Sequence, residues 1–176
     1  SPTGLCERKD EEIVDFLQNM SKKRNKRFEI KPKLGEKMKT AVIVYNSKTG
    51  ITKKYAEEIA SYLKSKGISI RISSIQAFQG NLLSDSDFVF LGSWTNGLMF
   101  ILQHPDREWK DFAAKLPSVP DVKVALFTTY KILTGSMFRN MYKQLKGKFA
   151  PPSLELKSRN GSLSEKDKQA LENLIS

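Results

Sequence analysis

The sequence predicts an α/β protein: a three-layer, doubly wound, five-stranded parallel sheet with the strand order 2-1-3-4-5. Two observations lead to this fold class. From residue 40 onward, apolar segments of strand length alternate with amphipathic segments of helix length. Parallel neighbours need a helix-sized, right-handed crossover, and most of the connections between the apolar segments have that length.

The strand segments differ in how they are patterned. The run Phe88-Val89-Phe90-Leu91 is continuously apolar, which indicates burial on both faces, whereas residues 68–73 alternate. The segment 75–86 is too short and too polar for a long helix. The five predicted strands are residues 41–45, 68–73, 88–91, 122–127 and 154–157.

The helices are predicted from apolar stripes with helical spacing and from their end signals. Residues 52–66 form a helix that ends at Gly67, and a second helix begins near His104-Pro105, where proline suits the first turn. Ser164 is the expected cap of the last helix. The inward faces are Ala56, Ile59, Ala60 and Leu63; Trp109, Phe112, Ala113 and Leu116; Phe138, Met141, Tyr142 and Leu145; and Leu171, Leu174 and Ile175.

Residues 1–38 are predicted to be an N-terminal appendage to a domain formed by residues 39–176. Residues 9–20 carry apolar side chains at helical spacing, which predicts a short amphipathic helix. Residues 22–27 form a basic run, and residues 31–36, with Pro32 and Gly35, have the composition of a linker.

Composition excludes several classes of function. A chain of 176 residues with 39% hydrophobic and 28% charged residues fits one soluble globular domain. The sequence has no apolar run that could cross a bilayer and no signal-peptide segment, so a cytoplasmic location is expected. Cys6 and His104 are the only residues of their types, so the sequence gives no support for a zinc or haem site.

The chain is strongly basic, with 30 Lys and Arg against 19 Asp and Glu, a formal net charge of +11. Residues 1–40 hold 11 basic and 7 acidic residues, and residues 41–176 hold 19 and 12, so both parts are positive. Such a surface attracts acidic partners at low salt.

A ligand site is predicted where the first strand meets the first helix of the domain. The segment is Ser47-Lys48-Thr49-Gly50-Ile51-Thr52. Hydroxyl groups and backbone N–H groups converge at a helix start, and Gly50 permits a tight turn close to an anion, so a phosphate monoester fits this segment. The alternative is a polar turn in which Ser47 or Thr49 only caps the helix.

The pattern Ser/Thr-x-Thr-Gly-x-Thr after the first strand resembles the phosphate loop of the flavodoxins, which hold the phosphate of flavin mononucleotide (FMN) there. The resemblance covers about residues 40–176. It implies FMN as cofactor, one-electron transfer without a catalytic residue, and a redox partner protein. Flavodoxins are usually acidic, so for this basic chain the expected partner is acidic at its docking face.

In this fold, ligands lie at the carboxyl edge of the sheet, between the first and third strands. Two further segments should therefore share the ligand. The segment after the third strand is Gly92-Ser93-Trp94-Thr95-Asn96-Gly97, and the one after the fourth is Thr128-Thr129-Tyr130, followed by Gly135-Ser136. Trp94 and Tyr130 suit the faces of a flavin ring, and glycine and serine backbone amides suit its polar edge.

Each of these residues also has a purely structural interpretation. Trp94 could fill the sheet edge, Tyr130 could be an ordinary loop tyrosine, and Lys131 could be a solvated lysine. No carboxylate lies between Phe127 and Arg139, and a cation beside a flavin predicts a less negative second reduction potential than acidic flavodoxins have. Trp109 is expected in the core, and His104 is assigned no catalysis.

Two alternative functions remain open at this stage. A flavodoxin-like FMN oxidoreductase would act on a quinone or a porphyrinogen-type substrate, although the enzymes of this kind carry a longer insertion than residues 98–103. An anion-binding module would use the basic N-terminal segment on nucleic acid or an anionic membrane. A dinucleotide site is not supported, because Gly-x-Gly-x-x-Gly is absent after the first strand.

Overall fold

The computed structural model describes Gly35, residues 37–98 and residues 101–176, with the backbone alone described at 96–98 and 101–104. These residues fall within one compact unit. The predicted appendage, including the helix 9–20 and the basic run 22–27, lies outside the described residues except for its last few positions. The proposed boundary near residue 38 therefore stays a prediction.

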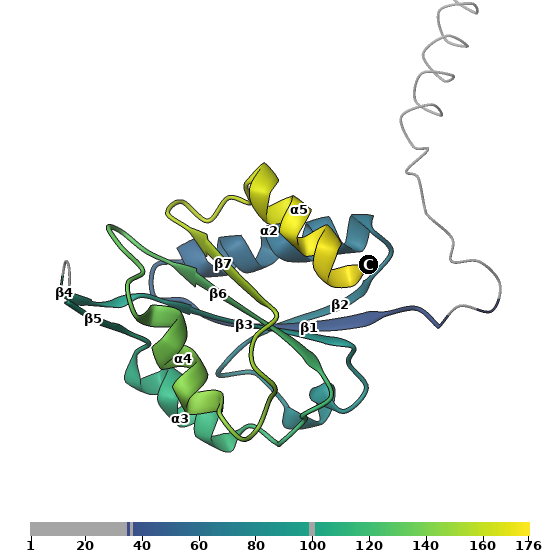
Figure 1. The fold of residues 1–176 in the computed structure, drawn as a ribbon, viewed down its shortest axis with the longest axis horizontal. Coiled ribbons are helices and arrows are strands. Elements are labelled where there is room, and N and C mark those ends of the chain that lie inside the picture. Colours follow the sequence, from purple (N-terminus) through teal and green to yellow (C-terminus); the bar gives the residue numbers. More distant parts are fainter. Residues whose placement is uncertain (1–34, 36, 99–100) are drawn as a thin grey trace, which may run out of the picture. The chain divides into compact units, whose positions relative to one another are not determined.

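A five-stranded parallel sheet forms the middle layer, as the sequence predicts (Figure 1). Its spatial order is β2-β1-β3-β6-β7, which is the predicted order 2-1-3-4-5. β1 lies second from one edge and pairs with both β2 and β3, so the order reverses there. The strands are β1 Thr40–Asn46, β2 Ser69–Ser74, β3 Phe88–Trp94, β6 Lys123–Thr129 and β7 Leu154–Ser158.

Helices cover both faces of this sheet (Figure 1). α2 (Ile51–Ser65) and α5 (Glu165–Ile175) lie on one face, and α3 (Arg107–Lys115) and α4 (Met137–Leu145) lie on the other. The connection between β2 and β3 contains only the single turn η1 (Gly80–Leu83), in agreement with its polar sequence.

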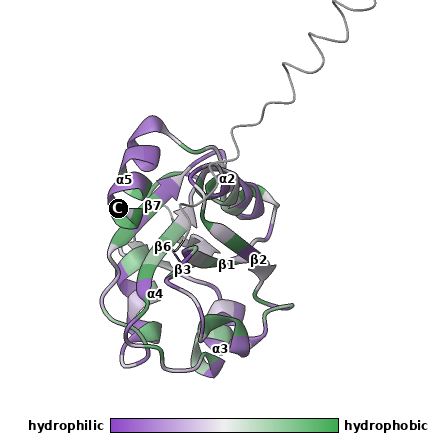
Figure 2. Cartoon of the chain, turned by 90° about the vertical axis from the view of Figure 1, so that its right-hand side faces the viewer, coloured by the Kyte–Doolittle hydropathy of each residue, from purple (hydrophilic) through white to green (hydrophobic). Residues whose placement is uncertain are grey.

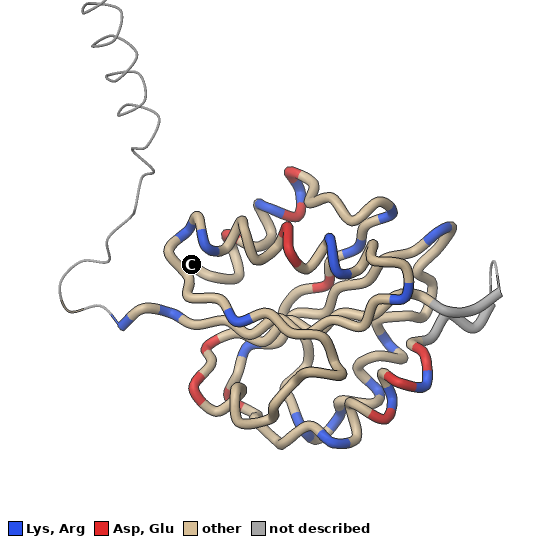
Figure 3. The backbone as a smooth tube through the Cα atoms, turned by 180° about the vertical axis from the view of Figure 1, so that it is seen from behind, with Lys and Arg blue, Asp and Glu red and all other residues tan. Residues whose placement is uncertain are grey.

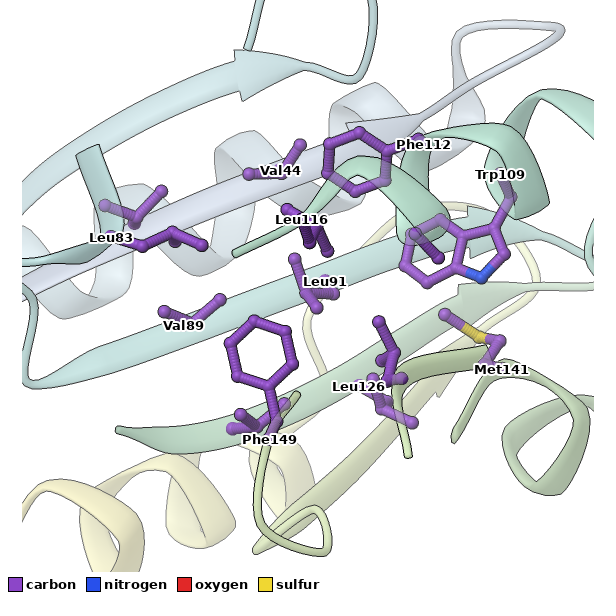
Figure 4. Packing of buried hydrophobic residues seen from close by; sticks show 14 of the residues in the cluster. Val44, Leu83, Val89, Leu91, Trp109, Phe112, Leu116, Leu126, Met141 and Phe149 are labelled. Carbon is purple, nitrogen blue, oxygen red and sulfur yellow. The ribbon is translucent and has the colours of Figure 1, made fainter. Parts of the chain in front are cut away.

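The two hydrophobic cores follow from the alternation of side chains along each strand. Val42 and Val44 of β1 face the core beneath α3 and α4, whereas Ala41 and Ile43 face the core beneath α2 and α5. Figure 2 shows the hydrophobic strands between helices of mixed colour. Trp109 is fully buried in the first core, beside Leu126 and Met141 (Figure 4), so its predicted role in packing is confirmed.

The third strand is longer than the predicted 88–91, because β3 continues to Trp94. A Cβ at Gly92 would lie 2.0 Å from Cε2 of Phe127, so only glycine leaves room for the Phe127 ring against this part of β3. Ser93 then pairs with Asn46 of β1 and Thr128 of β6. Three residues predicted in a loop, Gly92, Ser93 and Trp94, therefore belong to the end of a strand.

A small hairpin follows, which the sequence analysis did not predict. β4 (Asn96–Leu98) pairs antiparallel with β5 (Ile101–His104). The apolar run after Gly97 has no helical periodicity, and a local antiparallel pair satisfies its backbone groups. α3 begins after this hairpin at Arg107, two residues beyond the predicted Pro105.

Candidate functional site

The first of the three predicted segments is a tight turn between β1 and α2. The backbone N–H of Gly50 donates to the Ser47 hydroxyl at 3.1 Å, and Gly50 has a left-handed conformation with φ 87°. Lys48, Thr49 and Gly50 are exposed, and a Cβ at Gly50 would meet no atom within 4 Å. The turn thus borders open space.

The start of α2 differs from the cap-only alternative. Gly50 is the N-cap residue, and in the described part of the chain no side chain accepts a hydrogen bond from the first N–H groups of this helix. By contrast, Asp106 caps α3 and Ser164 caps α5 with a reciprocal capping box. Uncapped N–H groups and the helix dipole favour an anion at the start of α2.

Threonine hydroxyls join the three segments at the carboxyl edge of the sheet. The Thr52 hydroxyl lies 2.6 Å from that of Thr129, so the first segment is tied to the third. The Thr95 hydroxyl lies 3.0 Å from that of Thr128, and the Thr95 N–H donates to the Thr129 carbonyl at 2.9 Å. Thr52 and Thr129 are buried, which makes this hydroxyl pair part of the floor of the site.

Trp94, the first predicted ring-binding aromatic, is half-buried at the end of β3. Its indole Nε1 donates to Oδ2 of Asp106 at 3.1 Å. The same carboxylate accepts a hydrogen bond from Asn46 Nδ2 at 2.6 Å and from the Trp109 backbone N–H at 3.0 Å. Lys48 Nζ lies 5.1 Å from the centre of the Trp94 ring, so the phosphate-loop segment and the aromatic side chain are neighbours.

Tyr130, the second predicted aromatic, is half-buried after β6. Its backbone N–H donates to the Ser158 carbonyl at 3.2 Å, which ties it to the end of β7. The Arg159 guanidinium lies 5.5 Å from the centre of the Tyr130 ring and donates to the Ile132 carbonyl at 3.2 Å. Each aromatic therefore has a cation within reach of a cation–π interaction.

The remaining predicted site residues are placed less fully. Gly135 has φ 45°, and Ser136 is the N-cap residue of α4, where its hydroxyl accepts a hydrogen bond from Asn140 Nδ2 at 3.1 Å. The side chain of Asn96, that of His104 and the surroundings of Gly97 lie outside what the structure describes. Their assignments stay predictions.

Sequence reasoning missed a fourth segment at this edge, the turn from Ser158 to Ser162. A Cβ at Gly161 would lie 2.6 Å from the Ile51 carbonyl oxygen, so this turn packs directly on the start of α2. Lys54 Nζ donates to the Asn160 carbonyl at 3.3 Å and to the Ser162 hydroxyl at 3.2 Å. The run Ser-Arg-Asn-Gly-Ser after the last strand was the available signal.

Asp106 was also missed. An aspartate just before an amphipathic run is a common helix cap, and the sequence contains that signal. The sequence does not show that this carboxylate also contacts the Trp94 indole and the Asn46 amide, because those residues precede it by 12 and 60 positions.

The buried side chain of Tyr55 joins the two helices on one face of the sheet. Tyr55 of α2 donates its hydroxyl to Asp167 Oδ2 at 3.0 Å and packs edge-on against Phe127. Burial, with Asp167 as the next cause, raises the pKa of the Tyr55 hydroxyl far above its ordinary value. Tyr55 thus stays protonated and links α2 to α5.

Neither a metal site nor a membrane-spanning helix is found within the described residues. They include no group of three or more His, Cys, Asp or Glu side chains that could hold a metal ion. None of the helices described here is long and apolar enough to cross a membrane.

The fold defines a class of protein: a doubly wound α/β protein whose sheet order reverses at β1, the place where such folds bind ligands. Residues 42–149 match the family described as the flavodoxin domain, and this match spans more than half of the chain. The chain therefore belongs to the flavodoxin family. No curated protein matches its sequence.

Solved flavodoxin structures share the fold at low sequence identity. The two-electron reduced flavodoxin of Megasphaera elsdenii matches with a TM-score of 0.61 and 21% identity, over 76% of this chain and 97% of that chain. Flavodoxin 2 of Bacillus cereus matches with a TM-score of 0.60 and 21% identity, over 77% and 95%. The Fusobacterium nucleatum flavodoxin bound to FMN matches with a TM-score of 0.53 and 14% identity, over 78% and 95%.

Proposed function

We propose that this chain is an FMN-binding electron carrier. The observation that supports this most is the meeting of the segments after β1, β3 and β6 at one edge of the sheet, joined through Thr52, Thr95, Thr128 and Thr129. The similar Fusobacterium nucleatum flavodoxin is bound to FMN. When bound, this cofactor supplies the redox chemistry, since its isoalloxazine ring gains and loses electrons one at a time.

The turn from Ser47 to Thr52 would hold the phosphate. The uncapped start of α2 offers backbone N–H donors, and Ser47 and Thr49 offer hydroxyl groups beside them. Lys48 is exposed at the same turn and adds a positive charge. Thr52 stays a predicted phosphate ligand, and its buried hydroxyl is also bonded to Thr129.

Trp94 and Tyr130 would bind the ring. Asp106 holds the Trp94 indole by its N–H, and Arg159 lies over the Tyr130 ring, so both aromatics are oriented by charged neighbours. Lys131 and Arg159 place positive charge beside Tyr130. Positive charge favours the anionic reduced form of a flavin, so this segment would make the second reduction potential less negative.

Ligand titration tests the phosphate assignment. Quenching of flavin fluorescence should show that the protein prefers FMN to riboflavin by at least about tenfold, because charge-assisted hydrogen bonds contribute about 1.5 to 3 kcal/mol. Thr49→Ala should lower the affinity for FMN and leave the affinity for riboflavin nearly unchanged. Ser61→Ala, on the exposed side of α2, is the matched control. Equal affinities for the two ligands would refute the assignment.

A second titration tests the ring assignment. Trp94→Ala should lower the affinities for FMN and for riboflavin alike, since stacking contributes about 0.5 to 1.5 kcal/mol beyond the buried area and does not depend on the phosphate. The visible absorption bands should shift as well. Unchanged affinities and an unchanged spectrum would make Trp94 a packing residue.

Direct turnover separates the carrier from the enzymatic alternative. A carrier reduced with dithionite should pass electrons to a redox protein and reduce a soluble quinone slowly and without saturation. Rapid, saturable turnover of a quinone or an anionic tetrapyrrole without a partner protein would favour the flavodoxin-like oxidoreductase. From the net charge of +11, we expect the physiological partner to be an acidic redox protein.

A further inference from the structure

Cations dominate three of the segments at the carboxyl edge of the sheet. Residues 46–54, 128–140 and 157–162, which follow or end β1, β6 and β7, contain no acidic residue. Figure 3 shows blue segments on the loops at this end of the sheet. Their cationic residues are Lys48, Lys53, Lys54, Lys131, Arg139, Lys157 and Arg159.

Two half-buried carboxylates at the starts of α3 and α5 already have internal partners. Asp106 accepts hydrogen bonds from Trp94, Asn46 and the backbone of Trp109. Asp167 accepts hydrogen bonds from the Tyr55 hydroxyl and the Ser164 backbone. Within the described residues, neither Lys48, Lys131 nor Arg159 forms an ion pair.

Exposed apolar side chains lie among these cations. Ile132 and Leu133 are 41% and 46% exposed, and Ile51 is 37% exposed at the start of α2. Only two other large apolar side chains in the described residues are this exposed: Met38, before β1, and Ile72, on the edge strand β2. Apolar residues surrounded by charged ones are typical of protein docking surfaces.

Hydrogen bonds to residues 158 and 159 hold the loop that carries Ile132 and Leu133. Arg159 donates to the Ile132 carbonyl and lies over the Tyr130 ring, and the Tyr130 N–H is bonded to the Ser158 carbonyl. The loop is thus tied to the end of β7 on both sides of Lys131. Binding to a loop with such ties costs less conformational entropy than binding to one that must first be ordered.

We propose that Ile132 and Leu133, with Lys131 and Arg159 beside them, form the docking surface for an acidic redox protein. This inference rests on the proposed function, because the same loop carries Tyr130, which would bind the flavin ring. The apolar pair makes the contact, the cations select acidic partners and speed their approach, and the electron passes near Tyr130.

Two forms of one haem protein provide the test. Native cytochrome c is basic, and succinylated cytochrome c carries the same haem on an acidic surface. Dithionite reduces the FMN-loaded protein, excess reductant is removed, and each reduced flavin passes one electron to a ferric haem, which becomes ferrous. At low ionic strength the succinylated form should be reduced at least about tenfold faster than the native form. The difference should fade from about 0.01 M to about 1 M salt, as the Debye length falls from about 30 Å to about 3 Å.

Matched variants locate the surface. Lys131→Glu should remove most of the preference for the succinylated form, whereas Lys166→Glu, on the exposed side of α5, should change it little. The double variant Ile132→Ser/Leu133→Ser should weaken binding of succinylated cytochrome c by about tenfold. Ile72→Ser, an equally exposed apolar residue on β2, is its control.

A binding measurement keeps this inference separate from the cofactor. Amide resonances of Lys131, Ile132, Leu133 and Arg159 should shift when succinylated cytochrome c is added to the flavin-free protein, where no electron passes. Failure to bind FMN would refute the proposed function and leave this result standing. The docking proposal is overturned if native cytochrome c reacts equally fast, if the control variants have the same effect, or if the double variant loses binding to phosphatidylserine vesicles instead.

Discussion

Asp106 caps α3 and accepts hydrogen bonds from Trp94 and from Asn46 of β1, so replacing it should affect both stability and ring binding. Asp106→Ala removes three hydrogen bonds: the cap to the Trp109 N–H, the bond from Trp94 Nε1 and the bond from Asn46 Nδ2. Loss of the cap costs about 1 kcal/mol. Each bond to this half-buried carboxylate contributes about another 1 kcal/mol.

The expected total is a loss of about 3 kcal/mol in the free energy of unfolding, which lowers Tm by about 10 °C for a domain of this size. Asp106→Asn keeps an oxygen for the cap, so it should lose only about 1 kcal/mol. Asp111→Ala on the same helix is the control, because Asp111 and its partner Arg107 are both exposed and 4.0 Å apart. That variant should stay within about 0.5 kcal/mol of the parent.

Thermal unfolding and a double-mutant cycle measure these effects. Trp94→Phe keeps an aromatic ring but removes the indole N–H, so its combination with Asp106→Ala isolates the bond between the two side chains. We expect a coupling energy of about 1 kcal/mol. A coupling of zero, or a Tm for Asp106→Ala equal to that of the Asp111→Ala control, would refute this reasoning.

Three further predictions concern stability, each measured by thermal unfolding. Gly92→Ala should cost about 1 to 3 kcal/mol or prevent folding, since the new Cβ meets the Phe127 ring at 2.0 Å; an unchanged Tm would show that the Phe127 ring can move aside without cost. Gly161→Ala should also destabilise the protein, because the new Cβ would lie 2.6 Å from a backbone oxygen and the residue has a φ of 75°. It should weaken FMN binding as well; a loss of stability with unchanged FMN affinity would place this turn outside the site. Glu172→Gln should lower Tm at pH 7, because Lys66, as the main cause, holds the pKa of Glu172 below its ordinary value. Because folding lowers the pKa of Glu172, its ionised side chain stabilises the protein at pH values above the unfolded-state pKa of about 4.3. This stabilisation is lost as the pH falls through the folded-state pKa, so the Tm difference between Glu172→Gln and the parent should vanish in acid. A difference that persists there would point to packing.

The sequence predicts the strands and the layers well because burial has a local signature. The run Phe88-Val89-Phe90-Leu91 is apolar at every position, and the helix of residues 51–65 has one apolar face. A parallel strand in the middle of a sheet must be covered on both faces, so its apolar pattern can be recognised from the local sequence alone. The exact strand ends were harder to predict: β3 continues beyond Leu91 because it pairs there with β1 and β6, and the Phe127 ring that lies against Gly92 is 35 positions away.

For the site, the sequence by itself determined which segments meet: in a parallel sheet of this order, the residues after β1, β3 and β6 share one edge. It could not determine what each side chain does there. Thr52 belongs to the phosphate-loop motif, yet its hydroxyl is bonded to Thr129, and Asp106, outside every motif, holds Trp94. Residue type and spacing fix the backbone path through local propensity and burial, whereas side-chain partners depend on distances between segments far apart in the chain, and only the tertiary structure sets those distances.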